Sequence, residues 1–247
     1  MGCADAFEEL GWPWLRLSEE TEMSDGNAAG YLPGDPRYGL SGETLKQYYR
    51  EKPAQWAIYC WDRPGAAEAR QALLAEQKAY VAALGERVIG YGHFVSDDGR
   101  ETLGTSFFVQ LDDRAAADAF VANEPMNKAG LFERVEISRW SNSFLKRAAD
   151  YKRKGLQQFL CTGPKTGTPE FFREHLHAHE SYFASYAESF IFRGPIRSAD
   201  GTENIGTALM LELPDRTAAD QFWNNEPFAK HGGYSDNPRI IRWVFGD

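Results

Sequence analysis

The stretch that decides the fold lies at residues 79–132, "AYVAALGERVIGYGHFVSDDGRETLGTSFFVQLDDRAAADAFVANEPMNKAGLF". It recurs at residues 181–234 as "SYFASYAESFIFRGPIRSADGTENIGTALMLELPDRTAADQFWNNEPFAKHGGY". The two stretches align without a gap, at a constant offset of 102 residues (182 − 80, 194 − 92, 226 − 124). The matched positions include glycines and a Glu-Pro step: Gly92 with Gly194, Gly99 with Gly201, Gly104 with Gly206, and Glu124-Pro125 with Glu226-Pro227. Chance does not hold one offset through so many such positions, so the chain contains two copies of one domain.

Each copy is predicted to form strand, helix, strand, strand, helix, strand. In the first copy, a β-rich segment at 55–61 precedes strong helix formers at 66–84, and strands at 87–96 and 104–111 flank a turn. A helix capped by Asp112 or Asp113 and an alternating strand at 132–140 complete the copy, and the second copy repeats the order. This is the ferredoxin-like plan. We therefore predict an α+β fold: two tandem ferredoxin-like (βαββαβ) domains packed sheet to sheet as an intramolecular pseudo-dimeric α+β barrel, with an extended N-terminal segment.

The repeat also predicts the domain organisation. Residues 1–53 form an extended N-terminal tether, 54–141 the first repeat, 142–155 a polar, basic linker, and 156–247 the second repeat. The linker, "NSFLKRAADYKRKG", is compatible with a helix.

Composition excludes several classes of function. The 247 residues carry a net charge of −9, which argues against nucleic-acid binding, because phosphate neutralisation needs a basic surface. No run approaches 18 apolar residues, so no transmembrane segment is predicted. Cys3, Cys60 and Cys161 are odd in number and far apart, which indicates buried or free thiols in a reducing compartment.

Several motifs resemble those of the YCII-related domains of the dimeric α+β barrel superfamily. They are "DRPGAAEAR", "AYVAALGERVIGYG", "RGPI", "DDG…G", "AADAF", the "NEP" steps and the closing "VEISRW", over residues 54–141 and 156–247. The resemblance implies the family's fold. It also implies a site, in which a histidine of the first helix pairs with an aspartate of an Asp-Pro step after the second helix.

The two copies differ at this implied site. The second copy has His179 at the histidine position, whereas the first has Gln77, and both have Glu at the acidic position, as Glu124 and Glu226. Imidazole exchanges a proton near neutral pH and an amide does not, so only a His179–Glu226 pair could act as an acid–base dyad. The alternative is that His179 is hydrogen-bonded in a pocket for structural reasons.

No metal or cofactor site is predicted. His175 and His179 are four residues apart on one helix face, but no third ligand and no HExxH motif accompanies them. A polar helix face is the alternative reading of "HLHAH". The chain has no Gly-rich phosphate loop, no GxSxG and no CxxC.

The N-terminal segment carries apolar residues at spacings suited to lying along a surface. These predicted binding residues are Trp12, Trp14, Leu15, Tyr31, Leu32, Tyr38 and Leu40. The stretch "YLPGDPRYGLSGETLKQYYREK" at 31–52 also resembles the N-terminal segment of chlorophyll-binding light-harvesting proteins, through Leu32-Pro33-Gly34-Asp35 and Gly39-Leu40-Ser41. The Phe-Asp-Pro portion of that pattern is missing, and convergence of turn-rich linkers is the alternative.

Two functions follow from these features. The first is a non-catalytic subunit of a larger assembly that docks through its N-terminal extension. The light-harvesting resemblance implies a photosystem–antenna complex as partner and a chloroplast location, peripheral to the thylakoid membrane; the alternative location is the cytoplasm. The second is a small-molecule enzyme of the YCII type that uses the His179–Glu226 dyad. The lost histidine of the first copy and the long extension favour the first function.

Overall fold

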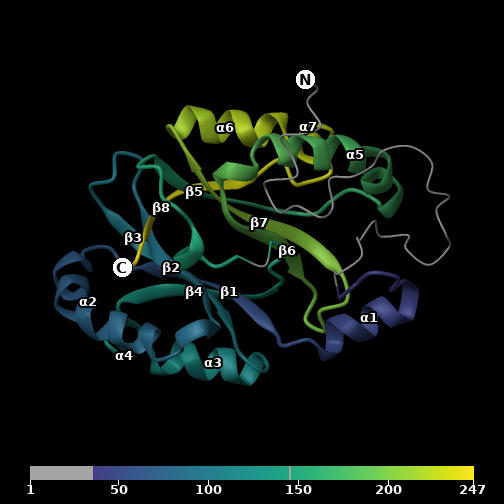
Figure 1. Cartoon of the computed structure of the whole chain (residues 1–247). Helices are drawn as coiled ribbons and strands as arrows, with labels where there is room; N and C mark the ends of the chain where they lie inside the picture. Colours follow the sequence, from purple (N-terminus) through teal and green to yellow (C-terminus); the bar gives the residue numbers. More distant parts are fainter. Residues whose placement is uncertain (1–35, 145) are drawn as a thin grey trace. The chain divides into compact units, whose positions relative to one another are not determined.

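The computed structural model describes residues 36–144 and 146–247 (Figure 1), and the chain divides into two compact units between Lys52 and Pro53. The first unit contains a turn and then helix α1 (Gly42–Glu51). Its N-cap, Ser41, donates its backbone N–H to Thr44 Oγ1 at 3.1 Å, and the Thr44 hydroxyl donates to the Ser41 carbonyl at 2.7 Å. The first of these bonds satisfies an N–H group that the first turn of a helix leaves unbonded. The polar run before the first repeat thus forms a short helix.

The second unit contains the two repeats in the predicted order of elements. The first repeat consists of β1 (Gln55–Asp62), α2 (Ala67–Ala82), η2 (Gly85–Arg87), β2 (Val88–Val95), β3 (Thr102–Gln110), α3 (Arg114–Asn123), α4 (Pro125–Lys128) and β4 (Phe132–Trp140). The second repeat consists of β5 (Gln157–Pro164), α5 (Pro169–Ser185), η4 (Ala187–Ser189), β6 (Phe190–Arg197), β7 (Asn204–Leu213), α6 (Arg216–Asn225), α7 (Pro227–Lys230) and β8 (Arg239–Phe245). Between them the described residues of the linker, 142–144 and 146–155, are irregular except for η3 (Ala148–Asp150), so they do not form the helix that the composition allowed.

Within residues 53–144 and 146–247, eight strands form a closed barrel in the order β1-β3-β2-β8-β5-β7-β6-β4. Each repeat keeps the ferredoxin-like strand order, β4-β1-β3-β2 and β8-β5-β7-β6. Helices α2, α3 and α4 lie on one side of the strands and α5, α6 and α7 on the other (Figure 1). The predicted tandem ferredoxin-like α+β barrel is therefore confirmed. The two sheets do more than face each other, because antiparallel pairing of β2 with β8 and of β4 with β6 joins their edges.

Two repeated glycines permit these joints. A Cβ atom on Gly92 of β2 would lie 2.2 Å from the Val244 carbonyl oxygen, and one on Gly194 of β6 would lie 1.7 Å from the Ser141 carbonyl oxygen. Real Cβ atoms do not approach oxygen so closely, so any side chain here would push the partner strand away. The match of Gly92 with Gly194 thus has a structural cause, which is closure of the barrel at two equivalent edges.

The first and last strands of each repeat, β1 with β5 and β4 with β8, are equivalent at an offset of 103 rather than 102. Ile58 of β1 pairs with Ile137 and Phe107, and its counterpart Cys161 pairs with Ile240 and Leu209. The differences are 161 − 58 = 103, 240 − 137 = 103 and 209 − 107 = 102. The ungapped stretch at 79–132 therefore captures the middle of the repeat, whereas the first and last strands are shifted by one residue. A shift of one residue moves a side chain to the opposite face of a strand. Equivalent residues in the first and last strands must therefore be matched at the offset of 103.

Aromatic side chains fill the barrel. The interior cluster includes the fully buried Trp140 and Trp243, which are equivalent at 243 − 140 = 103. Each indole N–H is satisfied: Trp140 donates to the Gly194 carbonyl at 3.1 Å and Trp243 to Ser106 Oγ at 2.8 Å. In each repeat, one further apolar cluster lies between the sheet and its helices.

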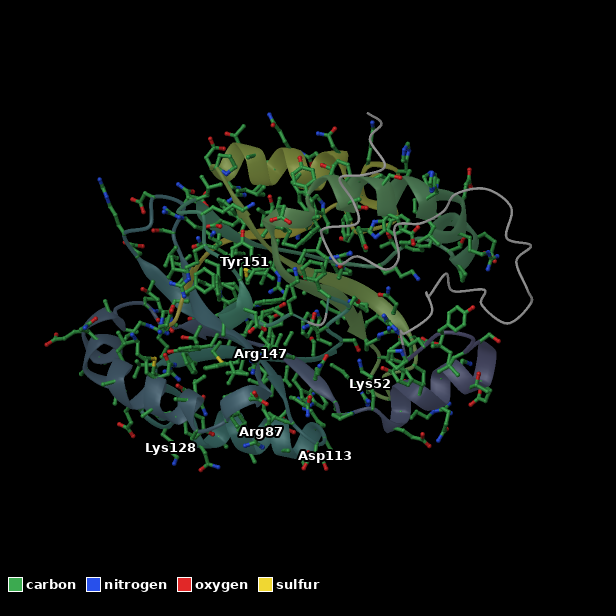
Figure 2. The ribbon with its side chains drawn as sticks, viewed as in Figure 1. Lys52, Arg87, Asp113, Lys128, Arg147 and Tyr151 are labelled. Atoms are coloured by element: carbon green, nitrogen blue, oxygen red, sulfur yellow. The ribbon has the colours of Figure 1, made fainter. Side chains whose placement is uncertain are left out.

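Local sequence signals explain the ends of helices. Asp113, labelled in Figure 2, caps α3 by accepting the Ala116 N–H at 2.7 Å, as one of the two predicted candidates. Asp215 caps α6 in the same way, through the Ala218 N–H at 2.8 Å.

Among residues 36–144 and 146–247, no helix has the length and apolar character needed to cross a membrane.

Candidate functional site

The structure brings His179 and Glu226 together in the second repeat. His179 lies on α5, which begins at Pro169 after the N-cap Thr168, whose hydroxyl accepts the Phe171 N–H at 3.3 Å. The Nδ1 atom of His179 lies 2.6 Å from Glu226 Oε1. Because an ionised carboxylate only accepts hydrogen bonds, Nδ1 carries the proton of this bond.

The Glu-Pro step explains why the carboxylate points at the histidine. A residue before proline favours an extended backbone, and Glu226 has φ −61° and ψ 123°. Pro227 then starts α7, where its missing N–H costs nothing. Glu226 caps this helix with Oε2, which accepts the Ala229 N–H at 2.8 Å, and Oε1 remains for His179. The longer side chain of Glu, compared with the Asp of the YCII pattern, therefore still forms the contact.

Aromatic rings fix the plane of the imidazole. The ring of Phe228 stacks on His179 at a centroid distance of 4.1 Å and an angle of 12°, and Phe183 lies at 4.0 Å. Glu226 is fully buried, whereas 15% of the His179 side chain remains exposed. No described residue forms a hydrogen bond with Nε2 of His179. The site therefore presents one imidazole nitrogen, held by a buried carboxylate on its other side.

The equivalent site of the first repeat is closed by hydrogen bonds. Gln77 donates from Nε2 to Glu124 Oε1 at 2.7 Å, and its Oε1 accepts the Tyr91 hydroxyl at 2.9 Å. Gln77 is completely buried and Glu124 is 1% exposed. Burial raises the pKa of Glu124, although hydrogen bonds from Gln77 and the Asn127 backbone act in the opposite direction. The pair keeps the geometry of the second repeat but lacks the imidazole that exchanges a proton near neutral pH.

Arg193, which the sequence prediction missed, lies near the site, because it contacts the same aromatic ring as His179. It aligns with Tyr91 (193 − 91 = 102), and its guanidinium carbon lies 4.6 Å from the ring centroid of Phe183, which also contacts His179. Further rings at 5.0 Å and 5.5 Å belong to Phe190 and Phe144. Burial lowers the pKa of Arg193 to about 10, so it stays positively charged at neutral pH. The available signal was a charged residue inside the apolar strand "FIFRGPI".

The first repeat contains a second missed feature, a buried polar network around Arg70. Arg70 forms an ion pair with Asp62 and donates to Thr105 Oγ1 at 2.9 Å, and His93 Nδ1 lies 3.4 Å from its guanidinium. Burial, together with the charges of Arg70 and Lys78, lowers the pKa of His93 to about 4. The sequence offered no partner for His93, because its partners come from two other elements.

Two of the remaining histidines, His175 and His231, lie side by side. His175 lies with Nδ1 3.0 Å from the Phe171 carbonyl oxygen and with its ring centroid 4.7 Å from that of His231. Within residues 36–144 and 146–247, no group of three or more His, Cys, Asp or Glu side chains is arranged to hold a metal ion.

Most of the predicted N-terminal binding residues lie outside the described residues, namely Trp12, Trp14, Leu15, Tyr31 and Leu32. Of the two that are described, Tyr38 is 49% exposed and Leu40 is partly buried. The light-harvesting resemblance also rests largely on this part of the chain. The predicted partner complex and the chloroplast location stay predictions.

The closed barrel of two ferredoxin-like halves is that of a dimeric α+β barrel, with both halves formed by one chain. Residues 54–141 match the YCII-related domain, so the chain contains a domain of this family in its first repeat. Comparison with curated proteins finds no match.

Solved structures show the same fold over both repeats. A putative chlorite dismutase superposes with a TM-score of 0.52 at 13% identity, covering 78% of this chain and 96% of its own. A variant of chlorite dismutase from Candidatus Nitrospira defluvii gives a TM-score of 0.52 at 8% identity, covering 82% and 96%. A 5-chloro-2-hydroxyhydroquinone dehydrochlorinase from Burkholderia phenoliruptrix AC1100 is 26% identical, covers 37% of this chain and 98% of its own, and has a TM-score of 0.34.

These comparisons correct the function favoured from the sequence. The prediction of a non-catalytic structural subunit is wrong, because the structures that share the fold over both repeats carry the names of enzymes. The loss of histidine in the first repeat was given too much weight, since the second repeat retains an assembled His179–Glu226 pair. The findings favour the alternative, a small-molecule enzyme.

Proposed function

We propose that the second repeat is an acid–base site for a small molecule, in which His179 transfers a proton through Nε2. One observation carries this proposal: His179 Nδ1 is hydrogen-bonded to the buried Glu226 at 2.6 Å, and Nε2 has no hydrogen bond with any described residue. A carboxylate on one nitrogen fixes the tautomer in which the other nitrogen carries a free lone pair. That nitrogen can accept a proton from a substrate and return it.

Glu226 has a positioning role in this scheme. When Nε2 takes up a proton, the imidazole becomes positively charged, and the neighbouring carboxylate stabilises that charge. The proton bound by Nδ1 stays where it is, and the substrate is left with the electron pair of the broken bond. Phe228 and Phe183 keep the ring in the plane that serves this bond.

Arg193 supplies the complementary charge. A substrate that loses a proton to His179 becomes an anion, and a cation beside the same aromatic ring stabilises it. Arg193 is held against Phe183, 4.6 Å from its ring centroid, and remains protonated at neutral pH. We therefore propose a substrate with an acidic C–H or O–H group, such as a carbon acid next to a carbonyl or a phenol.

The test is proton exchange in D2O. A panel of carbonyl compounds with exchangeable α-protons is incubated with the protein, and loss of each α-proton signal is followed by NMR. The wild-type chain should accelerate exchange for a subset of the panel, and His179→Gln should reduce that acceleration by about 10² or more, the usual contribution of a positioned general base. The variant should remain folded, because the first repeat holds the same Gln–Glu pair at 2.7 Å.

Gln77→Ala provides the matched control in the other repeat. It should leave the exchange rate unchanged once circular dichroism shows that the variant is folded. Exchange that is equal for wild type and His179→Gln, or no acceleration for any compound, would contradict the proposal. Equal loss in the Gln77→Ala variant would show that the active repeat has been assigned wrongly.

A further inference from the structure

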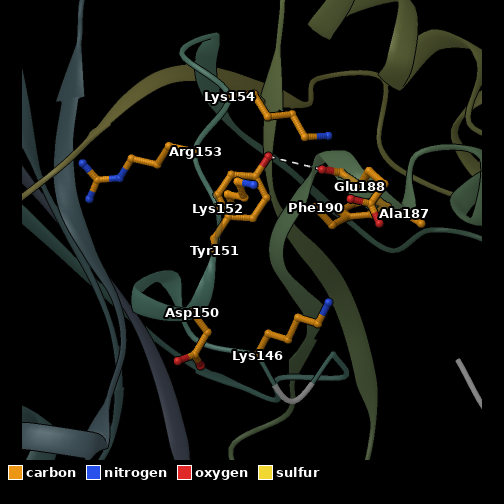
Figure 3. Close-up of a pocket in the computed structure, with 9 residues that line it drawn as sticks. All are labelled: Lys146, Asp150, Tyr151, Lys152, Arg153, Lys154, Ala187, Glu188 and Phe190. Atoms are coloured by element: carbon orange, nitrogen blue, oxygen red, sulfur yellow. Dashed lines mark hydrogen bonds between the residues drawn. The ribbon is translucent and has the colours of Figure 1, made fainter. Parts of the chain in front are cut away.

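A pocket lies where the linker passes the start of β6 (Figure 3). Its volume is about 550 Å³, within the range of small-molecule sites. One wall is the linker and the other is the turn before β6. The lining residues are Lys146, Asp150, Tyr151, Lys152, Arg153, Lys154, Ala187, Glu188 and Phe190.

The charge of this pocket is opposite to that of the chain. Four of its nine lining residues are cations and two are acids, although the chain as a whole carries −9. Asp150 already binds Arg147 at 3.4 Å, and Arg153 pairs with Asp247. Among the described residues, no carboxylate lies within ion-pair distance of Lys146, Lys152 or Lys154. Three lysines thus line one hollow without an ion-pair partner in the part of the chain that the structure describes, and Glu188 is the one acid of the hollow that no described cation pairs with.

The backbone that carries two of these lysines is held by a buried carboxylate. Glu212 is 1% exposed and accepts the N–H groups of Lys154 at 2.8 Å and Leu156 at 3.1 Å, together with the Tyr151 hydroxyl at 2.9 Å. Burial acts to raise the pKa of Glu212, but these hydrogen bonds outweigh it and lower the pKa. Tyr151 and Ala148 also pack against the barrel interior. The linker, marked by Arg147 and Tyr151 in Figure 2, is therefore a fixed wall rather than a solvated tether.

We infer that this pocket binds a small organic phosphate. Ammonium groups act as point charges that suit phosphate, and three of them border the hollow. The ring of Tyr151, which is partly exposed, gives the same pocket an apolar surface for the organic part of the ligand (Figure 3). A long polyanion such as nucleic acid is disfavoured by the net charge of −9. This site is independent of the His179–Glu226 pair.

Calorimetric titration with phenyl phosphate tests the inference, with inorganic phosphate and phenol as comparison ligands. Phenyl phosphate should bind saturably to the full chain, more tightly than either comparison ligand. Lys152→Ala combined with Lys154→Ala should weaken binding by about tenfold or more, the effect of losing one charge-assisted hydrogen bond. Neither change removes a backbone N–H that Glu212 accepts.

The matched control is Arg100→Ala combined with Lys128→Ala, which removes the same charge from the exposed surface of the first repeat. This control and His179→Gln should bind phenyl phosphate as the wild type does. If the control pair weakens phenyl phosphate binding as much as the lysine pair does, the loss would come from the change in net charge alone. That result would overturn the inference. The absence of saturable binding, or inorganic phosphate binding as tightly as phenyl phosphate, would also overturn it.

Discussion

Glu136 and Arg239 occupy equivalent positions in the two repeats (239 − 136 = 103) and form an ion pair of 2.9 Å between β4 and β8. Strand β4 belongs to the first repeat and β8 to the second, and the two strands are not neighbours in the barrel. The ion pair therefore links the two repeats without backbone pairing between these strands. In a barrel of two identical chains, the same position would carry the same charge twice. Fusion of the repeats in one chain allows an acid in one copy and a base in the other. The His179 and Gln77 positions have diverged in the same manner.

The first prediction concerns the stability that Glu136 provides. Its Oε1 accepts from Trp61 Nε1 at 2.9 Å and pairs with Arg134 and Arg239, each at 2.9 Å. Glu136→Gln should lower the free energy of unfolding by about 1–2 kcal/mol, because charge-assisted bonds become neutral ones. Urea denaturation measures this value. Arg173→Gln, which breaks an exposed pair with Glu170, is the control and should change it by less than about 0.5 kcal/mol.

The second prediction concerns pH and His93. Its pKa in the folded state, about 4, is below the usual histidine value near 6.5, so the unfolded chain binds the proton more readily. The stability that His93 provides is therefore full above about pH 6.5 and is lost as the pH falls through about 4. His93→Gln should make the unfolding free energy depend less steeply on pH in this window. An unchanged slope between wild type and variant would contradict the burial of His93 beside Arg70.

The third prediction concerns thiol reactivity. Cys60 and Cys161 are buried free thiols, and burial raises the pKa of both. Because the thiolate is the reactive form, N-ethylmaleimide should leave both unmodified in the native protein and should modify both in denaturant. Mass spectrometry of the peptides measures each residue separately. Rapid native labelling of either cysteine would show that its strand is not packed as described.

The sequence was sufficient for the fold because the repeat and its periodicity are local patterns. Strands, helices and the Asp113 cap can be read from residues that are neighbours in the chain. The edge pairing of β2 with β8 and the one-residue shift of the first and last strands could not be read in this way, because they depend on which residues face each other across the barrel.

The candidate site was only half predictable. His179 and Glu226 followed from the implied YCII pattern, and the structure places them in contact. Arg193 could be noticed only by asking why the position of Tyr91 holds a cation in an apolar strand. The Asp62–Arg70–His93 network had no sequence signal, since its members come from separate elements. Only the folded structure shows that these three side chains are buried in contact with one another.

Replacement of Glu226 by Gln tests whether this carboxylate prepares His179 for proton transfer. The Ala229 N–H needs an oxygen from residue 226, so the amide oxygen of Glu226→Gln should remain there. The amide NH2 would then face Nδ1 of His179, which must accept, and the imidazole proton would move to Nε2. The variant should lose the base while it keeps the helix cap.

Side-chain 15N NMR of His179 is the most direct measurement. In the neutral imidazole of the wild-type chain, the proton should lie on Nδ1 and the lone pair on Nε2. In Glu226→Gln the two nitrogens should exchange these roles. A wild-type imidazole with its proton on Nε2, or the same tautomer in both proteins, would contradict the claim that Glu226 prepares His179 for proton transfer.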